Sequence, residues 1–125
     1  MNIVNSKHAP APIGPYNQAI EFNGMLFCSG QIALNPEDGS LVMDSIQNET
    51  HQVMKNIQAI LNEAGLTFNH IIKTTIFLSD MQLFSEVNDI YASYFSNHYP
   101  ARETVAVLGL PKGVHVEISV TAARF

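Results

Sequence analysis

Residues 99–122 read YPARETVAVLGLPKGVHVEISVTA, and they end in the most regular strand pattern of the chain. From residue 114 to residue 121, aliphatic side chains alternate with histidine, glutamate, serine and threonine. Successive side chains of a strand point to opposite faces of its sheet, so this pattern predicts one aliphatic face and one polar face. A second strand, which carries Arg102, precedes the turn residues GLPKG.

Two opposite charges, Arg102 and Glu117, stand in this otherwise largely apolar segment. If Val105 and Val107 join the aliphatic face, Arg102 and Thr104 lie on the polar face together with Glu117. The residues alone then leave two interpretations open. The charges form an ion pair across adjacent strands, or they are the two ends of a site. A sheet face of small polar residues also favours contact with another subunit.

The first half of the chain predicts a hairpin followed by a helix. Residues 8–16, HAPAPIGPY, form an extended segment rich in turns. Strands on both sides of Asn23 and Gly24 predict a β-hairpin, because this dipeptide is the strongest short hairpin signal. Apolar residues then recur at helical spacing up to residue 64, with Asp44 and Gln47 as an expected capping box and Gly65 at the C′ position.

The second half predicts a strand, a helix and the two strands already described. β-Branched residues are concentrated at residues 71–79, which favours a strand. Aromatic and aliphatic residues from Phe84 onward lie on one helical face, and this helix is expected to run until Tyr99 and Pro100. The order β-β-α-β-α-β-β predicts an α+β fold with two helices packed on one face of a mixed sheet.

Composition narrows the classes of function. The chain has 125 residues, the length of one domain, with 14% charged residues and a net charge of −5. The charged fraction lies below the ~25% of an average soluble domain, which favours an oligomer that hides part of its surface. The chain has no cluster of Lys and Arg residues of the kind that binds nucleic acid, and it has no apolar run long enough to cross a membrane. The first residues lack the apolar region of a signal peptide.

Cysteine and histidine usage gives no sign of a redox or metal centre. Cys28 is the only cysteine and lies in an apolar strand, where we expect a buried and inert thiol. The five histidines show no metal-ligand spacing, so we predict no metal site. His115 is expected on the polar face with Glu117, where it either lines a cleft or faces solvent. We expect a cytoplasmic protein without contact to nucleic acid or membrane.

Four blocks of sequence resemble the Rid family, the reactive intermediate deaminases also called YjgF-type proteins. They occur in the expected order and cover nearly the whole chain: APAPIGPYNQAI, LFCSGQIAL, IIKTTIFLSDMQLFSEVNDIY and PARETVAVLGLPKGVHVEI. The resemblance implies that residues 1–125 form a single Rid-type domain with a chorismate-mutase-like fold. It further implies a homotrimer with sites between subunits. The implied activity is that of a 2-iminobutanoate/2-iminopropanoate deaminase, which hydrolyses 2-aminoacrylate-type enamines and imines to 2-oxo acids and ammonia without a cofactor.

The resemblance also implies which residues do this chemistry. Arg102 matches the arginine that binds the substrate carboxylate, and Glu117 matches the acid that orients water. Residues that match the lining of the substrate pocket are Tyr16, Ser29 and Asn88. Two positions depart from the family pattern, since Thr104 stands where many relatives have cysteine and Glu103 directly follows the arginine. We expect Thr104 to alter substrate preference and Glu103 to point to the opposite face of the sheet.

Elementary chemistry supports this interpretation. Imine hydrolysis needs a held carboxylate, one aimed water and a protonated nitrogen, which makes the imine carbon electrophilic. The planar guanidinium of Arg102 suits the carboxylate, and Glu117 suits the water. A nearby arginine would lower the pKa of Glu117, so orienting the water is the safer role for this carboxylate.

Two other functions are alternatives to deamination. A trimeric protein that only binds small carboxylates, as a sensor or regulator, would use the same cleft between subunits. Ribonuclease activity, suggested for some members of the family, fits poorly with an acidic chain that lacks a basic patch.

Overall fold

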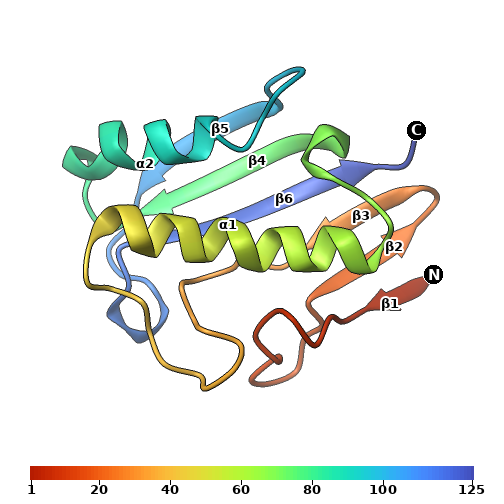
Figure 1. Cartoon of the computed structure of the whole chain (residues 1–125), viewed down its shortest axis with the longest axis horizontal. Helices are drawn as coiled ribbons and strands as arrows, with labels where there is room; N and C mark the ends of the chain where they lie inside the picture. The colour runs from red at the N-terminus through yellow and green to blue at the C-terminus, as the bar shows by residue number, and fades with distance from the viewer.

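Six strands form one sheet, and two helices cover one of its faces (Figure 1). We describe a computed structural model that covers residues 1–125. The strands are β1 Asn2–Val4, β2 Ala19–Phe22, β3 Met25–Cys28, β4 Ile71–Leu78, β5 Ala101–Ala106 and β6 Val116–Ala123. The helices are α1 Ile46–Glu63 and α2 Phe84–Ala92, and short 3₁₀ helices span Phe68–His70, Met81–Leu83 and Pro111–Gly113.

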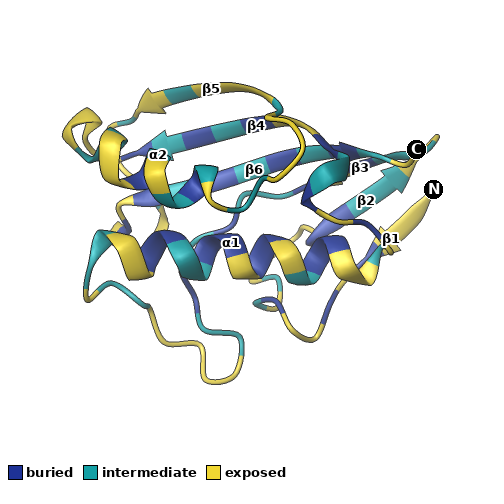
Figure 2. Ribbon diagram, turned by 45° about the horizontal axis from the view of Figure 1, so that its top comes forward, coloured by how far each residue is buried: buried dark blue, intermediate teal, exposed yellow.

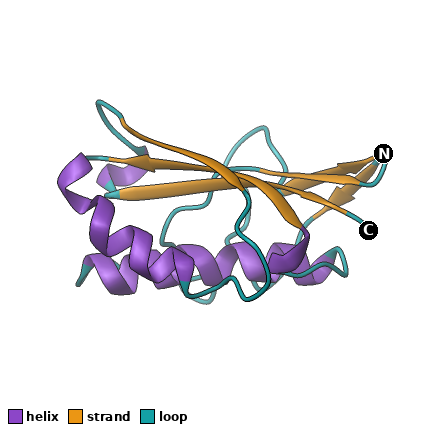
Figure 3. Ribbon diagram, turned by 90° about the horizontal axis from the view of Figure 1, so that it is seen from above, coloured by secondary structure: helices purple, strands orange, loops and turns teal.

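The sheet has the order β1-β2-β3-β6-β4-β5 and is mixed. Strand β4 pairs parallel with β5 and antiparallel with β6, and all other pairs are antiparallel. Figure 3 shows both helices on the same side of the sheet, so the opposite face, here called the open face, carries no helix. The predicted α+β fold is therefore confirmed. Strand β1 was not predicted, because its three residues are too few to show an alternating pattern. They form a strand only because they pair with β2.

The hairpin between β2 and β3 is confirmed at the predicted dipeptide. Asn23 and Gly24 both have positive φ, 51° and 75°, as a type I′ turn requires. The flanking residues Phe22 and Met25 are paired directly across the turn. The local sequence thus sets the register of these two strands.

Helix α1 begins differently from the prediction. Its N-cap is Ser45, whose hydroxyl accepts a hydrogen bond from the backbone N–H of Asn48 at 3.0 Å, so the expected box of Asp44 and Gln47 is wrong. Asp44 instead accepts a bond from the side-chain amide of Asn48 at 2.8 Å. The end of the helix agrees with the prediction, since Gly65 adopts a φ of 73°.

Helix α2 ends earlier than predicted, at Ala92. The hydroxyl of Ser93 donates to the carbonyl of Ile90 at 2.6 Å, and the chain leaves the helix there. Tyr94 and Phe95 still pack against the core, where their rings lie 5.3 Å and 5.7 Å from the ring of Phe68. The apolar pattern forms a core face, as predicted, but it continues beyond the end of the helix.

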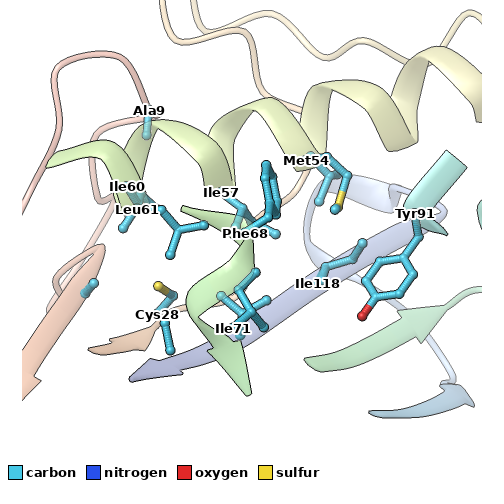
Figure 4. Close-up of a cluster of buried hydrophobic side chains, with 14 of the residues drawn as sticks. Ala9, Cys28, Met54, Ile57, Ile60, Leu61, Phe68, Ile71, Tyr91 and Ile118 are labelled. Atoms are coloured by element: carbon cyan, nitrogen blue, oxygen red, sulfur yellow. The ribbon is translucent and has the colours of Figure 1, made fainter. Parts of the chain in front are cut away.

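The core lies between the helices and the sheet (Figure 4). The apolar residues of α1 that are fully buried there are Val53, Met54, Ile57, Ile60 and Leu61. Each such side chain stabilises the fold by about 1.5–3 kcal/mol through removal from water. In Figure 2 the ribbon of β5 is exposed along most of its length, as expected of an edge strand. No helix combines the length and apolar composition needed to cross a membrane.

Candidate functional site

A cavity of about 450 Å³ opens beside the start of β6. We call it the Glu117 cavity, after the carboxylate in its wall. Its lining comes from the N-terminal segment, the loop after β3 and the 3₁₀ helix before β6, and consists of Pro10, Ala11, Ile13, Tyr16, Ser29, Gly30, Gln31, Ile32, Leu34, Pro111, Lys112 and Glu117. The cavity thus combines an apolar wall with one carboxylate and one ammonium group.

Glu117 is half-buried on the open face of the sheet. Burial raises the pKa of its carboxyl group, and no hydrogen bond or neighbouring charge contributes to that shift. The carboxylate lies against the backbone of Gly30, where an added Cβ would be 2.7 Å from Oε2. The absence of a side chain at Gly30 is what lets the carboxylate occupy this place.

Tyr16 and Ser29, predicted as pocket residues, both line the Glu117 cavity. The Ser29 hydroxyl donates to the carbonyl of Asn17 at 2.6 Å, which leaves its oxygen free to accept a bond from a ligand. The Tyr16 hydroxyl accepts from the backbone N–H of Ile13 at 3.4 Å. Three of the predicted site residues, Tyr16, Ser29 and Glu117, are therefore brought together in one cavity.

Arg102 lies elsewhere, in a second depression that we call the Arg102 cleft. It has a volume of about 510 Å³ and is lined by Asn88, Tyr91, Ala92, Tyr99, Pro100 and Arg102. Nη1 of Arg102 donates to Oδ1 of Asn88 at 2.7 Å, and the guanidinium carbon lies 5.5 Å from the ring centre of Phe84 and 5.2 Å from that of Tyr91. These three α2 residues lie on one helical face and hold the guanidinium in place.

Arg102 and Glu117 do not share a face of the sheet, contrary to the prediction. Arg102 pairs with Thr74, which is buried under the helices, whereas Glu117 pairs with Phe77 on the open face. Strand β4 also separates β5 from β6, so an ion pair across adjacent strands is excluded within one chain. Alternation sets which residues share a face within a strand, but it does not relate two strands joined by a loop.

The prediction that Val105 joins the aliphatic face of the sheet is wrong for the same reason. Val105 points to the open face and is 41% exposed, while Thr104 shares the helix-covered side with Arg102. Thr104 lines neither depression, and its buried hydroxyl oxygen has no hydrogen-bond partner in the chain. Glu103 points away from Arg102, as predicted, and forms an ion pair with Lys73 at 2.8 Å and a hydrogen bond with Thr75.

Three other residues depart from or extend the sequence predictions. His115 neither lines the cavity nor only faces solvent, because its Nδ1 lies 2.8 Å from Oε1 of the buried Glu49. Gly30 and Lys112, which line the cavity, were missed as site residues. The GLPKG motif signalled a turn, and Lys112 does adopt a left-handed φ of 57°, but nothing in the sequence indicated that this turn borders a cavity.

The predicted inert thiol is confirmed. Cys28, the last residue of β3, is buried, and desolvation raises the pKa of its thiol to about 12. A thiol of this kind is protonated at neutral pH and is no nucleophile.

Comparisons with known proteins agree with the resemblance of the sequence blocks. The family model described as Endoribonuclease L-PSP matches residues 6–124. The mouse protein named 2-iminobutanoate/2-iminopropanoate deaminase is 42% identical over 98% of this chain and 90% of its own length. A Lactococcus lactis protein that carries the name of a regulator, AldR, is 52% identical over 98% of this chain and 97% of its own.

Solved structures share the fold over the whole chain. The YjgF gene product of E. coli is 38% identical, with a TM-score of 0.94 and coverage of 100% of both chains. The Rid-family protein YyfA of Yersinia pestis is 53% identical, with a TM-score of 0.95 and coverage of 98% of both chains. The family model, the identities of the relatives and the shared fold agree with one another. The chain therefore belongs to the Rid family, the YjgF-type proteins.

Proposed function

We propose that this protein is a 2-iminobutanoate/2-iminopropanoate deaminase of the cytoplasm, a hydrolase that acts on 2-aminoacrylate-type enamines and imines. Relatives from mouse and human with this name, 42% and 40% identical, support the proposal. The observation that carries it is a pair of separate groups suited to the two parts of such a substrate. One is a guanidinium held by α2, and the other is a half-buried carboxylate without a partner.

The proposed active unit is a homotrimer in which the Arg102 cleft of one copy faces the Glu117 cavity of the next. Within one chain the two groups lie on opposite faces of the sheet, so a second copy has to supply one of them. Apolar side chains on the open face support such an assembly, since Ile3, Phe22 and Phe27 are each about half exposed. A trimer mass in light scattering is expected, and a mass of one chain would contradict the assembly.

The reaction follows from the chemistry of the two groups. The enamine tautomerises to a 2-imino acid, and protonation of the nitrogen makes the imine carbon electrophilic. Arg102 binds the substrate carboxylate with the N–H donors that Asn88 does not use. Glu117 accepts a proton or hydrogen bond from the water that attacks this carbon and so orients this water. The carbon–nitrogen bond then breaks, which gives the 2-oxo acid and ammonia with no cofactor.

The remaining residues have supporting roles in this proposal. Ser29 and Tyr16 offer hydroxyl groups beside Glu117, where they bind the substrate or the attacking water. Asn88 borders the carboxylate site and orients Arg102. Thr104 lies two residues after Arg102 on the same side of β5, and its hydroxyl, which has no partner in the chain, is the further hydrogen-bonding group that we assign to the substrate.

The test is a coupled assay in which a serine dehydratase generates 2-aminoacrylate and the formation of pyruvate is followed with and without this protein. Arg102→Ala is expected to lower kcat/KM about 10- to 100-fold, because charge-assisted hydrogen bonds contribute about 1.5–3 kcal/mol. Arg124→Ala is the matched control, since it removes the only other arginine, which lies at the end of β6 and pairs with Glu21. No acceleration by the wild type, or full activity of Arg102→Ala, would refute the proposal.

A second candidate is a protein that binds small carboxylates without turnover. Two relatives favour it: the AldR protein, which is named as a regulator, and the TdcF protein of E. coli, whose structure is described with bound serine. Calorimetric binding of 2-oxobutanoate together with no acceleration across a panel of imines would favour this candidate over deamination.

A further inference from the structure

A carboxylate that the proposed reaction does not use is completely buried in the fold. Glu49 lies in the first turn of α1 and has 0% exposure. Its Oε2 accepts hydrogen bonds from the backbone N–H of His115 at 2.8 Å and of Val116 at 3.1 Å. Its Oε1 lies 2.8 Å from Nδ1 of His115. Burial of a charged group is costly unless it is hydrogen-bonded, so the carboxylate depends on all three contacts.

The residues that Glu49 contacts, His115 and Val116, directly precede Glu117 in the chain. On the other side of Glu117, the backbone of Ile118 exchanges two hydrogen bonds with that of Gln31, at 2.8 Å and 3.1 Å. Gln31 follows Gly30, the residue against which the Glu117 carboxylate lies. Glu117 therefore occupies a short span of backbone that α1 holds on one side and the loop after β3 holds on the other.

We propose that Glu49 is a positioning residue for Glu117. By binding the backbone at residues 115 and 116, it sets where β6 begins and thus where the Glu117 carboxylate lies over Gly30. The inference rests on the proposed function in one respect, namely that Glu117 orients the attacking water.

The chemistry of the contacts favours positioning over a purely stabilising role. An apolar side chain at residue 49 would leave the backbone N–H groups of His115 and Val116 without this partner, so the buried acid is needed for those two backbone positions. A carboxylate, in contrast, binds two consecutive backbone N–H groups at defined positions. A shift of β6 by one residue would turn Glu117 from the open face to the helix-covered face, so control of this register matters for the site.

The imidazole of His115 is the second partner of Glu49 and is half-exposed. A carboxylate only accepts hydrogen bonds, so Nδ1 of His115 carries the hydrogen and donates it. The side-chain bond adds to the two backbone bonds but does not replace them. Removal of the imidazole is therefore expected to have a smaller effect on Glu117 than a change at Glu49.

The decisive variant is Glu49→Asp, which keeps the charge but is one methylene shorter. In the coupled assay we expect kcat to fall about tenfold or more, with KM within about twofold of the wild type, because the attacking water and not the carboxylate is misplaced. Glu49→Asp in a Glu117→Gln background is expected to cause little further loss. In an Arg102→Lys background, the loss of kcat caused by Glu49→Asp is expected to multiply with the loss caused by Arg102→Lys, because Arg102 lies in the other depression. Glu63→Gln, at the exposed end of α1, is the control that leaves kcat unchanged.

A second measurement does not require activity. Side-chain ¹³C NMR of the full-length protein reports the titration of Glu117, and Glu117→Gln identifies its signal. A misplaced, more hydrated Glu117 is expected to have a lower pKa in Glu49→Asp than in the wild type, while Glu63→Gln leaves it unchanged. If Glu49→Asp does not fold, Glu49→Gln is measured by the same two readouts.

Each outcome separates the two proposals. An unchanged titration of Glu117 in a folded Glu49 variant overturns the positioning role, and so do fully multiplicative effects with Glu117→Gln. A wild type that does not accelerate imine hydrolysis refutes the proposed function, and the NMR titration then still decides the positioning role.

Discussion

Gly30→Ala is expected to lower activity without lowering stability. A Cβ at residue 30 would lie 2.7 Å from Oε2, 3.0 Å from Cδ and 3.1 Å from Cγ of Glu117. Gly30 is not among the residues with positive φ, so alanine adds no backbone strain there. The clash involves only side-chain atoms of Glu117, and this flexible side chain has to move away while the backbone stays in place.

The size of this movement follows from ordinary contact distances. To retreat from 2.7 Å to the ~3.4 Å at which van der Waals contacts begin, the carboxylate oxygen must move by about 0.7 Å. A displacement of this order at a group that aims a reactant costs up to about 100-fold in rate, so we expect kcat to fall about 10- to 100-fold. Alanine also restricts the unfolded chain, which by itself stabilises a protein by about 0.4–1 kcal/mol. The free energy of unfolding should therefore stay the same or rise slightly.

Gly109→Ala provides the matched control, because no atom lies within 4 Å of a Cβ at that position. Both variants are compared in the coupled 2-aminoacrylate assay and in thermal unfolding followed by circular dichroism. The control should keep the wild-type kcat. Wild-type kcat in a folded Gly30→Ala protein, or equal losses in both variants, would refute the role assigned to the contact between Gly30 and Glu117.

Three further predictions concern the two depressions and the end of the chain. Asn88→Asp places a carboxylate 2.7 Å from Nη1 of Arg102, where it competes with the substrate, so KM should rise about tenfold. The control Asn97→Asp, at an exposed residue, should leave KM unchanged. An unchanged KM in Asn88→Asp would argue against carboxylate binding by Arg102. Because burial raises the pKa of Glu117 in the folded chain, the ionised form disfavours folding above that pKa, so Glu117→Gln should unfold at a higher temperature than the wild type at pH 7. This difference in melting temperature should vanish as the pH falls below the usual carboxyl range. A difference in melting temperature that is constant with pH would contradict this assignment. Arg124 donates hydrogen bonds to both carboxylate oxygens of Glu21, at 2.9 Å and 3.0 Å, and to the carbonyl of Ala64 at the end of α1. Arg124→Ala should therefore lower the melting temperature but leave kcat unchanged. An unaltered melting temperature would show that these bonds are not stabilising.

Local sequence predicted the elements whose cause is local. The Asn23-Gly24 turn, the C′ glycine of α1 and the alternation of β6 all have a signal within a few residues, and the structure confirms each of them. The errors lie where two local signals compete or where none exists. Ser45 replaced Asp44 as the N-cap because both residue types suit that position, and β1 is too short to show a pattern.

The sequence named candidate site residues but did not show where in the fold they lie. Tyr16, Ser29, Arg102 and Glu117 were selected through the resemblance of the blocks at residues 9–20, 26–34 and 100–118, and their roles stay a prediction. The roles of Gly30 and Glu49 had no signal, because each depends on a segment far away in the chain.

In residues 99–122, the sequence by itself determined two strands, the turn between them and the two charges they carry. Only the tertiary structure decided that β4 lies between these strands, parallel to one and antiparallel to the other, and that Arg102 and Glu117 point to opposite faces of the sheet. The physical reason is that alternation relates neighbours along one strand. Which strand pairs with which, and in what register, depends on how the whole apolar surface is buried against α1 and α2.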